Sequence, residues 1–163
     1  MIYDWHELQY IAHKALIAAR KSLQKHGHFE PIGLVFHDGG LSQAFEFSSR
    51  SSPDKRISQE VFKRLVVDLN AEAAIVVTES WIKVGPEIPL DRTKSIADDP
   101  ERTEALVIEA ASPHARYLII QTFAKDASGT VLFDVPIDTN NTFDGWSEWL
   151  DGVWPESNPK WSV

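Results

Sequence analysis

The chain has no cysteine among its 163 residues, and this absence excludes several kinds of chemistry. Disulfides, thiolate nucleophiles and zinc–thiolate centres are ruled out, and the composition suits a reducing compartment. The N-terminal segment lacks the basic start and apolar core of a secretory signal. No apolar run approaches the ~20 residues that span a bilayer. We therefore expect a soluble, cytoplasmic protein without a membrane partner.

Positive charge is also scarce. The chain has 16 Lys and Arg against 24 Asp and Glu, which gives a net charge of −8. Nucleic acid is therefore disfavoured as a partner, because binding its phosphates needs a positive surface. The basic residues that do gather are Arg50, Lys55, Arg56, Lys63 and Arg64. We interpret them as the solvated face of a helix.

Familiar catalytic motifs are missing as well. There is no glycine-rich phosphate loop and no Gly-x-Ser-x-Gly elbow. A helix–hairpin–helix–strand opening is similar to the cytidine-deaminase layout, but the zinc ligands of that family need cysteines that this chain lacks. The only His-x-His sequence, His26-Gly27-His28, stands at a predicted helix end without the downstream acid of the JAB-type zinc isopeptidases. We predict no metal ligand set and no cofactor.

Hydrophobic periodicity and turn residues predict eight elements in the order α-β-β-α-β-β-β-β. They are two helices, over residues 4–26 and 52–70, and six strands, over residues 32–36, 41–47, 73–84, 104–111, 116–124 and 131–137. His37-Asp38-Gly39-Gly40 is the turn of a hairpin, since glycines accept positive φ. Short turns between the last strands require antiparallel pairing. We expect an α+β fold with a single mixed, largely antiparallel sheet and helices packed on it.

The last part of the chain differs in composition from the rest. Residues 1–137 form the predicted α+β domain, whereas residues 138–163 hold four of the six tryptophans. We expect this Trp-rich C-terminal extension to pack on the domain or on a partner. Trp146, Trp149 and Trp154 are candidate interface residues, because tryptophan is enriched at interface hot spots. The same side chains can instead cover the chain's own sheet.

The most informative stretch runs from Ala73 to Ala111, where two apolar strands hold a long polar loop. Glu79 and Trp81 end the first strand, and their spacing of two places both side chains on one side of it. The loop and the start of the next strand add five charged residues: Asp98, Asp99, Glu101, Arg102 and Glu104. Binding residues are often carried by such a loop on a rigid scaffold. We take these seven residues as the candidate site.

Three interpretations of this candidate site remain open. Its carboxylates can share a proton or bind a hard cation such as Mg²⁺. They can also be ordinary turn and strand-start residues paired with Arg102, or they can recognise a partner. Trp81 can be a platform for a ligand or a core tryptophan near the sheet edge.

Two short motifs carry a resemblance to a known family. They are Thr78-Glu79-Ser80-Trp81 and the segment from Asp99-Pro100 through Arg102 and Glu104 to Leu106. As a pair they resemble a family of small bacterial and phage proteins of unassigned function, over about Tyr3 to Pro136. The resemblance implies the leading helix and the hairpin, but it implies no activity and no catalytic residue. The segment from Gly85 to Ile96 is longer than the family spacing.

Three functions are compatible with the sequence. The leading hypothesis is a non-enzymatic cytoplasmic interaction or accessory domain that acts as a homo-oligomer or with a protein partner. The second is a small enzyme or metal-dependent hydrolase that uses Glu79 and the acids from Asp98 to Glu104. The third is a small-molecule binding module around Trp81. A hollow beside Trp81 would favour the third, and a Trp81 packed on all sides would remove it.

Overall fold

The computed structural model describes residues 3–47, 52–82, 102–139, 149–150 and 153–154. It places in chain order α1 (Trp5–His26), β1 (Ile32–His37), β2 (Gly40–Glu46), α2 (Ser52–Asp68), β3 (Ala73–Ile82), β4 (Thr103–Ala111), β5 (Arg116–Lys125), β6 (Val131–Phe133) and β7 (Ile137–Thr139). The predicted order is found up to the last strand. That strand is divided in two by residues 134–136, which include Pro136, and proline cannot donate to a strand ladder. Its two pieces, β6 and β7, both pair with β5.

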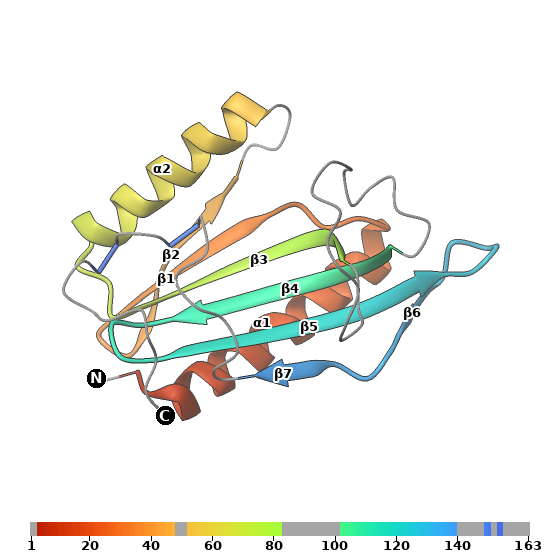
Figure 1. Ribbon diagram of the computed structural model, residues 1–163, viewed down its shortest axis with the longest axis horizontal. Helices are drawn as coiled ribbons and strands as arrows, with labels where there is room; N and C mark the ends of the chain where they lie inside the picture. Colours follow the sequence, from red (N-terminus) through yellow and green to blue (C-terminus); the bar gives the residue numbers. More distant parts are fainter. Residues whose placement is uncertain (1–2, 48–51, 83–101, 140–148, 151–152, 155–163) are drawn as a thin grey trace.

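All the strands belong to one sheet with the order β2-β1-β3-β4-β5-β6, and every pairing among the described strands is antiparallel (Figure 1). The predicted α+β class is therefore confirmed. The sheet is not mixed, however. Helix α2 connects β2 to β3, which run in the same direction but are separated by β1. The crossover consequently creates no parallel pair.

Helix α1 covers one face of the sheet and lies behind β4 and β5 in Figure 1. It begins where the Asp4 carboxylate accepts the backbone N–H groups of His6 and Glu7, at 2.9 and 3.1 Å. It ends at Gly27, whose φ of 77° is left-handed. Its buried face repeats every three or four residues: Leu8, Ala12, Leu16, Ala19 and Leu23. This face and the facing sheet residues form what we call the α1-side core.

The opposite face of the sheet packs against α2 in what we call the α2-side core. Phe62 of α2 is fully buried there and lies directly over Gly33 of β1. A Cβ atom at Gly33 would stand 2.4 Å from the Phe62 ring, so only glycine permits this approach. Leu150 and Val153 are buried in the same core. These two described residues of the C-terminal extension thus lie against the domain, and the packing of the extension as a whole stays a prediction.

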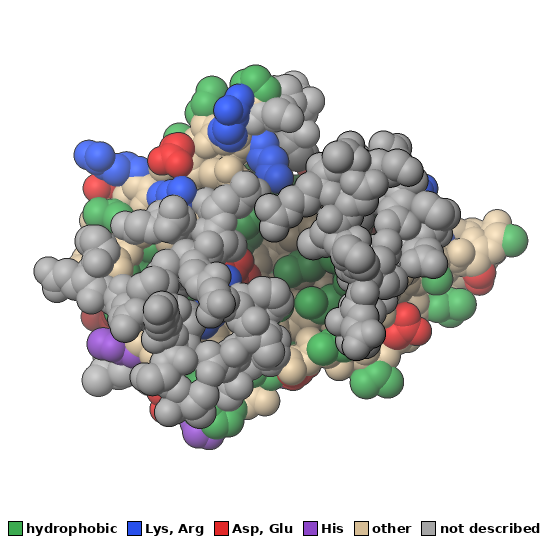
Figure 2. All heavy atoms as spheres, in the orientation of Figure 1, with side chains coloured by type: hydrophobic (Ala, Val, Ile, Leu, Met, Phe, Trp, Pro, Cys, Tyr) green, Lys and Arg blue, Asp and Glu red, His purple; other side chains and the backbone are tan. Residues whose placement is uncertain are grey.

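Lys55, Arg56 and Arg64 of α2 are exposed, whereas the Lys63 side chain is only 19% exposed. Figure 2 shows Lys and Arg side chains over this helix. Lys63 pairs with Glu60 at 3.2 Å and Arg64 with Asp68 at 3.3 Å, which are the usual neighbours along a solvated helix. Among the described residues, no helix combines the length and the apolar sequence that a membrane crossing needs.

Candidate functional site

A hollow of about 380 Å³ lies where β3 ends and β4 begins, beside the loop that joins α1 to β1. Residues 28–31, residues 79–81 and Glu104 line it. Trp81 and Glu104 are opposite each other in the β3–β4 ladder. The volume falls at the small end of the range of about 300–1,000 Å³ that is typical of ligand sites. We call this region the pocket end of the β1–β3 strand pair.

The α1–β1 loop is fastened to the sheet by two hydrogen bonds. The ammonium group of Lys125 donates to the carbonyl of Gly27 at 2.6 Å. The backbone N–H of Phe29 donates to Oε2 of Glu79 at 2.7 Å. The Phe29 side chain packs partly buried against the α1-side core. Glu79 therefore positions the loop that forms one wall of the hollow.

Trp81 keeps an accessible ring, with 40% of the residue exposed. The guanidinium carbon of Arg102 lies 4.6 Å from the centre of this ring. This distance is within the range of a cation–π contact, in which the negative face of the ring attracts a cation. The ring is not packed on all sides, and it already accepts a guanidinium group from its own chain.

The described lining of the hollow is rich in carboxylates. Glu30, Glu79 and Glu104 belong to it, and neither lysine nor arginine does. The His28 imidazole is held by its own loop, because its Nδ1 atom donates to the carbonyl of His26 at 3.2 Å. Its Nε2 atom lies 3.9 Å from Glu30. The hollow is therefore suited to a positively charged group.

The same lining does not pair a nucleophile with a base. The hydroxyl of Ser80 shares a hydrogen bond of 3.2 Å with the hydroxyl of Thr78, and alternation along β3 turns Ser80 to the face opposite Glu79 and Trp81. Among the described residues, the group of three potential metal ligands within 4.8 Å of one another lies elsewhere, at His37, Asp38 and Glu72.

Four of the seven predicted site residues are described, and the structure brings them together. Glu79, Trp81 and Glu104 line the hollow, and Arg102 lies on the Trp81 ring. Asp98, Asp99 and Glu101 lie outside the described residues. A shared proton or a bound cation among all the acids therefore stays a prediction.

Two of the three predicted interface tryptophans pack on the α2-side core, on the face of the sheet opposite the hollow. The Trp149 ring lies 4.6 Å from that of Phe47 in an edge contact. Nε1 of Trp154 donates to the carbonyl of Ala71 at 3.3 Å. Trp146 lies outside the described residues. A partner at these tryptophans stays a prediction.

The sequence did not predict the contribution of residues 28–31. The only signal in this loop was the His-x-His sequence at the end of α1. The loop reaches the end of β3 because β1 lies beside β3, and no local pattern reports which strands are neighbours.

A polar cluster away from the hollow joins α1, β5 and β7. The Tyr117 hydroxyl donates to Oδ2 of Asp138 at 2.6 Å, and Nε2 of His13 lies 2.7 Å from the same oxygen. Burial, followed by the hydrogen bond to Asp138, raises the pKa of Tyr117 to about 12. The phenol is therefore a permanent hydrogen-bond donor at neutral pH, and it ties β7 to the sheet.

The comparisons with known proteins do not assign the chain to a family. The resemblance of the two short motifs to small bacterial and phage proteins stays a prediction, and the site is interpreted from its own geometry. No family model matches the chain, and no curated protein and no solved structure matches it.

Proposed function

We propose that the protein is a non-enzymatic cytoplasmic binding domain whose hollow at the pocket end receives a small organic cation. The cation is an ammonium or guanidinium group, either free or on the side chain of a partner. One observation carries the proposal: an accessible tryptophan ring and three carboxylates surround the same hollow. An aromatic face together with carboxylates is the usual chemistry for holding such a group.

The neighbourhood of Trp81 supports this choice of ligand. The guanidinium group of Arg102 already lies over the ring, so the ring attracts a planar cation, and its exposed part is left for a second one. Glu104 stands opposite Trp81 in the adjacent strand and adds a carboxylate beside the ring. A charge-assisted hydrogen bond to a carboxylate is about twice as strong as a neutral one. The two contacts together favour a cation over a neutral molecule of the same size.

The size and setting of the hollow favour binding without reaction. A volume of about 380 Å³ fits a small molecule or one side chain. The Glu79 carboxylate already accepts a hydrogen bond from Phe29, which is a positioning role. The hydrogen bonds of Ser80 and His28 likewise go to their own segments. Recognition of a cation uses the exposed part of the Trp81 ring and the carboxylates of Glu30 and Glu104.

The test is a titration of the full chain with arginine amide and lysine amide, followed by the indole N–H signals of the tryptophans in ¹H–¹⁵N spectra. The Trp81 signal, assigned with a Trp81→Leu variant, is expected to shift and saturate. Added salt should weaken the effect, because part of the attraction is electrostatic. Trp81→Leu and Glu104→Gln should each weaken binding about tenfold or more, as loss of one strong polar or cation–π contact implies.

Trp5 provides a matched control, because it is also 40% exposed and lies beside the His6 ring, away from the described lining of the hollow. Trp5→Leu should leave binding unchanged. Equal shifts of the Trp5 and Trp81 signals would mean non-specific contact with exposed rings. Unchanged affinity in both Trp81→Leu and Glu104→Gln would contradict the proposal.

A further inference from the structure

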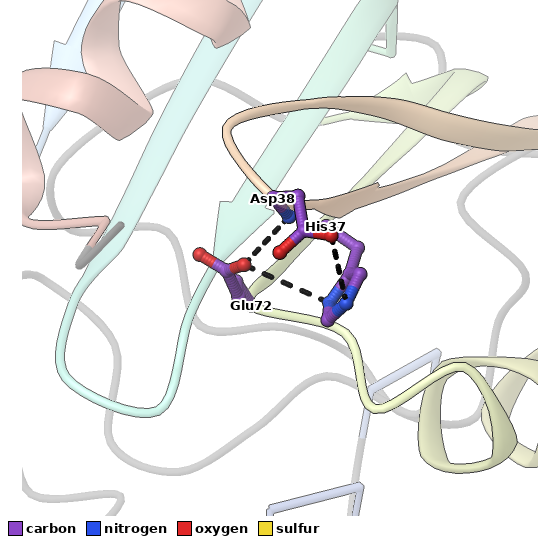
Figure 3. A group of neighbouring side chains, drawn as sticks. All are labelled: His37, Asp38 and Glu72. Carbon is purple, nitrogen blue, oxygen red and sulfur yellow. Dashed lines mark hydrogen bonds and ion pairs between the residues drawn. The ribbon is translucent and has the colours of Figure 1, made fainter.

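A second group of side chains lies at the opposite end of the same strand pair, where β1 turns into β2. His37 and Gly40 are opposite each other in the ladder, so the turn has two residues. Asp38 and Gly39 both have left-handed backbones, with φ of 51° and 78°. This is the type I′ geometry that an Asp-Gly pair favours. We call the group of His37, Asp38 and Glu72 the turn end of the β1–β3 strand pair (Figure 3).

Glu72 reaches the turn from another part of the chain. It follows α2 and precedes β3, and its backbone N–H donates to the carbonyl of Phe36 at 2.9 Å. Oε1 of Glu72 accepts the backbone N–H of Asp38 at 2.6 Å. The hairpin and the α2–β3 connection are therefore held together, and a carboxylate is fixed beside the turn.

The hydrogen bond of His37 determines which of its ring nitrogens keeps a lone pair. Its Nδ1 atom lies 3.1 Å from the carbonyl of Asn70. A carbonyl only accepts, so Nδ1 carries the proton and Nε2 of the neutral ring keeps its lone pair. Histidines that bind metals usually make this second hydrogen bond to a backbone carbonyl or a carboxylate, because it fixes the ring. His37 is thus oriented as a ligand.

The distances suit a common metal ion. Nε2 of His37 lies 3.5 Å from Oδ2 of Asp38. Two ligands with bonds of about 2.1 Å to a tetrahedral zinc ion stand about 3.4 Å apart. Oε1 of Glu72 lies 3.6 Å from Nδ1 of the same ring, and one ligand atom from each of the three residues lies within 4.8 Å of the others. The Glu72 carboxylate, which the Asp38 N–H holds beside the ring, is thus the third candidate ligand.

We propose that His37, Asp38 and Glu72 bind a divalent transition-metal ion of the zinc class. One imidazole with two carboxylates is a ligand set for such an ion, whereas Mg²⁺ and Ca²⁺ prefer oxygen ligands only. His37 is 37% exposed and Glu72 21% exposed at the side chain, so solvent reaches the group and water completes the coordination. The ion would join the β1–β2 turn to the α2–β3 connection. This site is independent of the cation site at the pocket end.

The test uses the full chain after treatment with a chelator. Zn²⁺ is titrated by calorimetry, and the histidine ring nitrogens are followed in long-range ¹H–¹⁵N spectra. One ion per chain is expected to bind at this site with a shift of the His37 Nε2 signal, and Mg²⁺ is expected to produce neither effect. Asp38→Asn retains the left-handed turn, and Glu72→Gln retains an acceptor for the Asp38 N–H. Each should weaken Zn²⁺ binding about tenfold or more.

A matched control is available at the start of α1. His6 and Asp4 form a histidine–aspartate pair at 3.9 Å, and Asp4→Asn keeps a side chain that caps the helix equally well. This variant should bind Zn²⁺ at the His37 site like the parent chain. An unshifted His37 signal would overturn the proposal. So would equal losses in Asp4→Asn and Asp38→Asn, or parent-like affinity in both Asp38→Asn and Glu72→Gln.

Discussion

At each end of the β1–β3 strand pair, a glutamate carboxylate accepts a backbone N–H group. The two ends differ in the side chains around that carboxylate. At the pocket end, Glu79 accepts the backbone N–H of Phe29. At the turn end, Glu72 accepts the backbone N–H of Asp38. The two glutamates are seven positions apart along the chain, which is about 23 Å at 3.3 Å per residue of extended chain. In each case a carboxylate on or next to β3 holds the chain that flanks β1.

The surroundings decide what each end can bind. At the pocket end, the carboxylate stands beside a hollow with an accessible tryptophan ring and two further acids. At the turn end, it stands beside an imidazole and a second carboxylate whose atoms converge within 4.8 Å. The first arrangement suits an organic cation and the second a metal ion. A glutamate beside a strand end therefore does not indicate a function by itself. The side chains around it determine which ligand the end can bind.

Gly33→Ala tests the strand that both ends share, and it is expected to have the largest effect on stability. The new methyl group would meet the buried Phe62 ring, which has Phe45 and Phe47 packed against it. Overpacking of this kind lowers the free energy of unfolding by about 1–3 kcal/mol. Urea denaturation of the parent and the variant measures the difference.

Gly40→Ala is the control for this prediction. Gly40 lies on the same hairpin, a Cβ atom there meets nothing within 4 Å, and its φ is not left-handed. The free energy of unfolding should change by less than about 0.5 kcal/mol, as for most exposed substitutions. If Gly33→Ala were as stable as Gly40→Ala, Phe62 would not pack against β1 as described.

Removing each fastening carboxylate compares the two ends directly. The bond from Phe29 to Glu79 is partly buried, whereas that from Asp38 to Glu72 is exposed. Water can replace the lost acceptor more readily at the exposed end. Glu79→Ala should therefore lower the free energy of unfolding by about 1–2 kcal/mol and Glu72→Ala by less than about 1 kcal/mol. Denaturation in urea measures both.

Glutamine variants show how much of the stability comes from the hydrogen bond and how much from the negative charge of each glutamate. Glu79→Gln and Glu72→Gln keep a carbonyl oxygen in reach of the donor, so most of the stability should return. A larger cost for Glu72→Ala than for Glu79→Ala would show that the turn end, and not the pocket end, is the stronger fastening.

The sequence predicted the elements better than their neighbours in space. The Asp4 cap, the Gly27 stop and the Asp38-Gly39 turn are local signals, and the structure has all three. The spacing of Glu79 and Trp81 also placed two hollow-lining residues on one side of a strand. These predictions needed only the geometry of single elements.

What could not be predicted depends on strand order. Neither the loop at residues 28–31 nor Glu72 is close in sequence to its partners, and both meet them because β1 lies beside β3. The turn after His37 was predicted because it contains glycines. Those glycines do not indicate that the Glu72 carboxylate from the α2–β3 connection lies beside the turn. Strand β7 was missed because three residues are too few to show alternation. A contact between its Asp138 and Tyr117 holds it instead.

The hydrogen bond from Tyr117 to Asp138 makes the free energy of unfolding depend on pH in the alkaline range. Tyr117 is 3% exposed and lies opposite Ala110 near the beginning of β5. Its pKa rises from the ordinary 10.0 to about 12 in the folded chain. The unfolded chain loses this proton first as the pH rises, so the contribution is complete below pH 10 and is lost as the pH approaches 12.

Between about pH 9 and pH 11, the parent chain should therefore lose about 1 kcal/mol more of its free energy of unfolding than Tyr117→Phe does. Other groups that titrate in this range are common to both chains and cancel in the difference. Phenylalanine also leaves Asp138 without the phenol, so the variant begins from a lower stability at neutral pH. Urea denaturation at the two pH values measures the loss in each chain. Equal losses would mean that the phenol ionises as readily in the folded chain as in the unfolded one, and that Asp138 does not hold its proton.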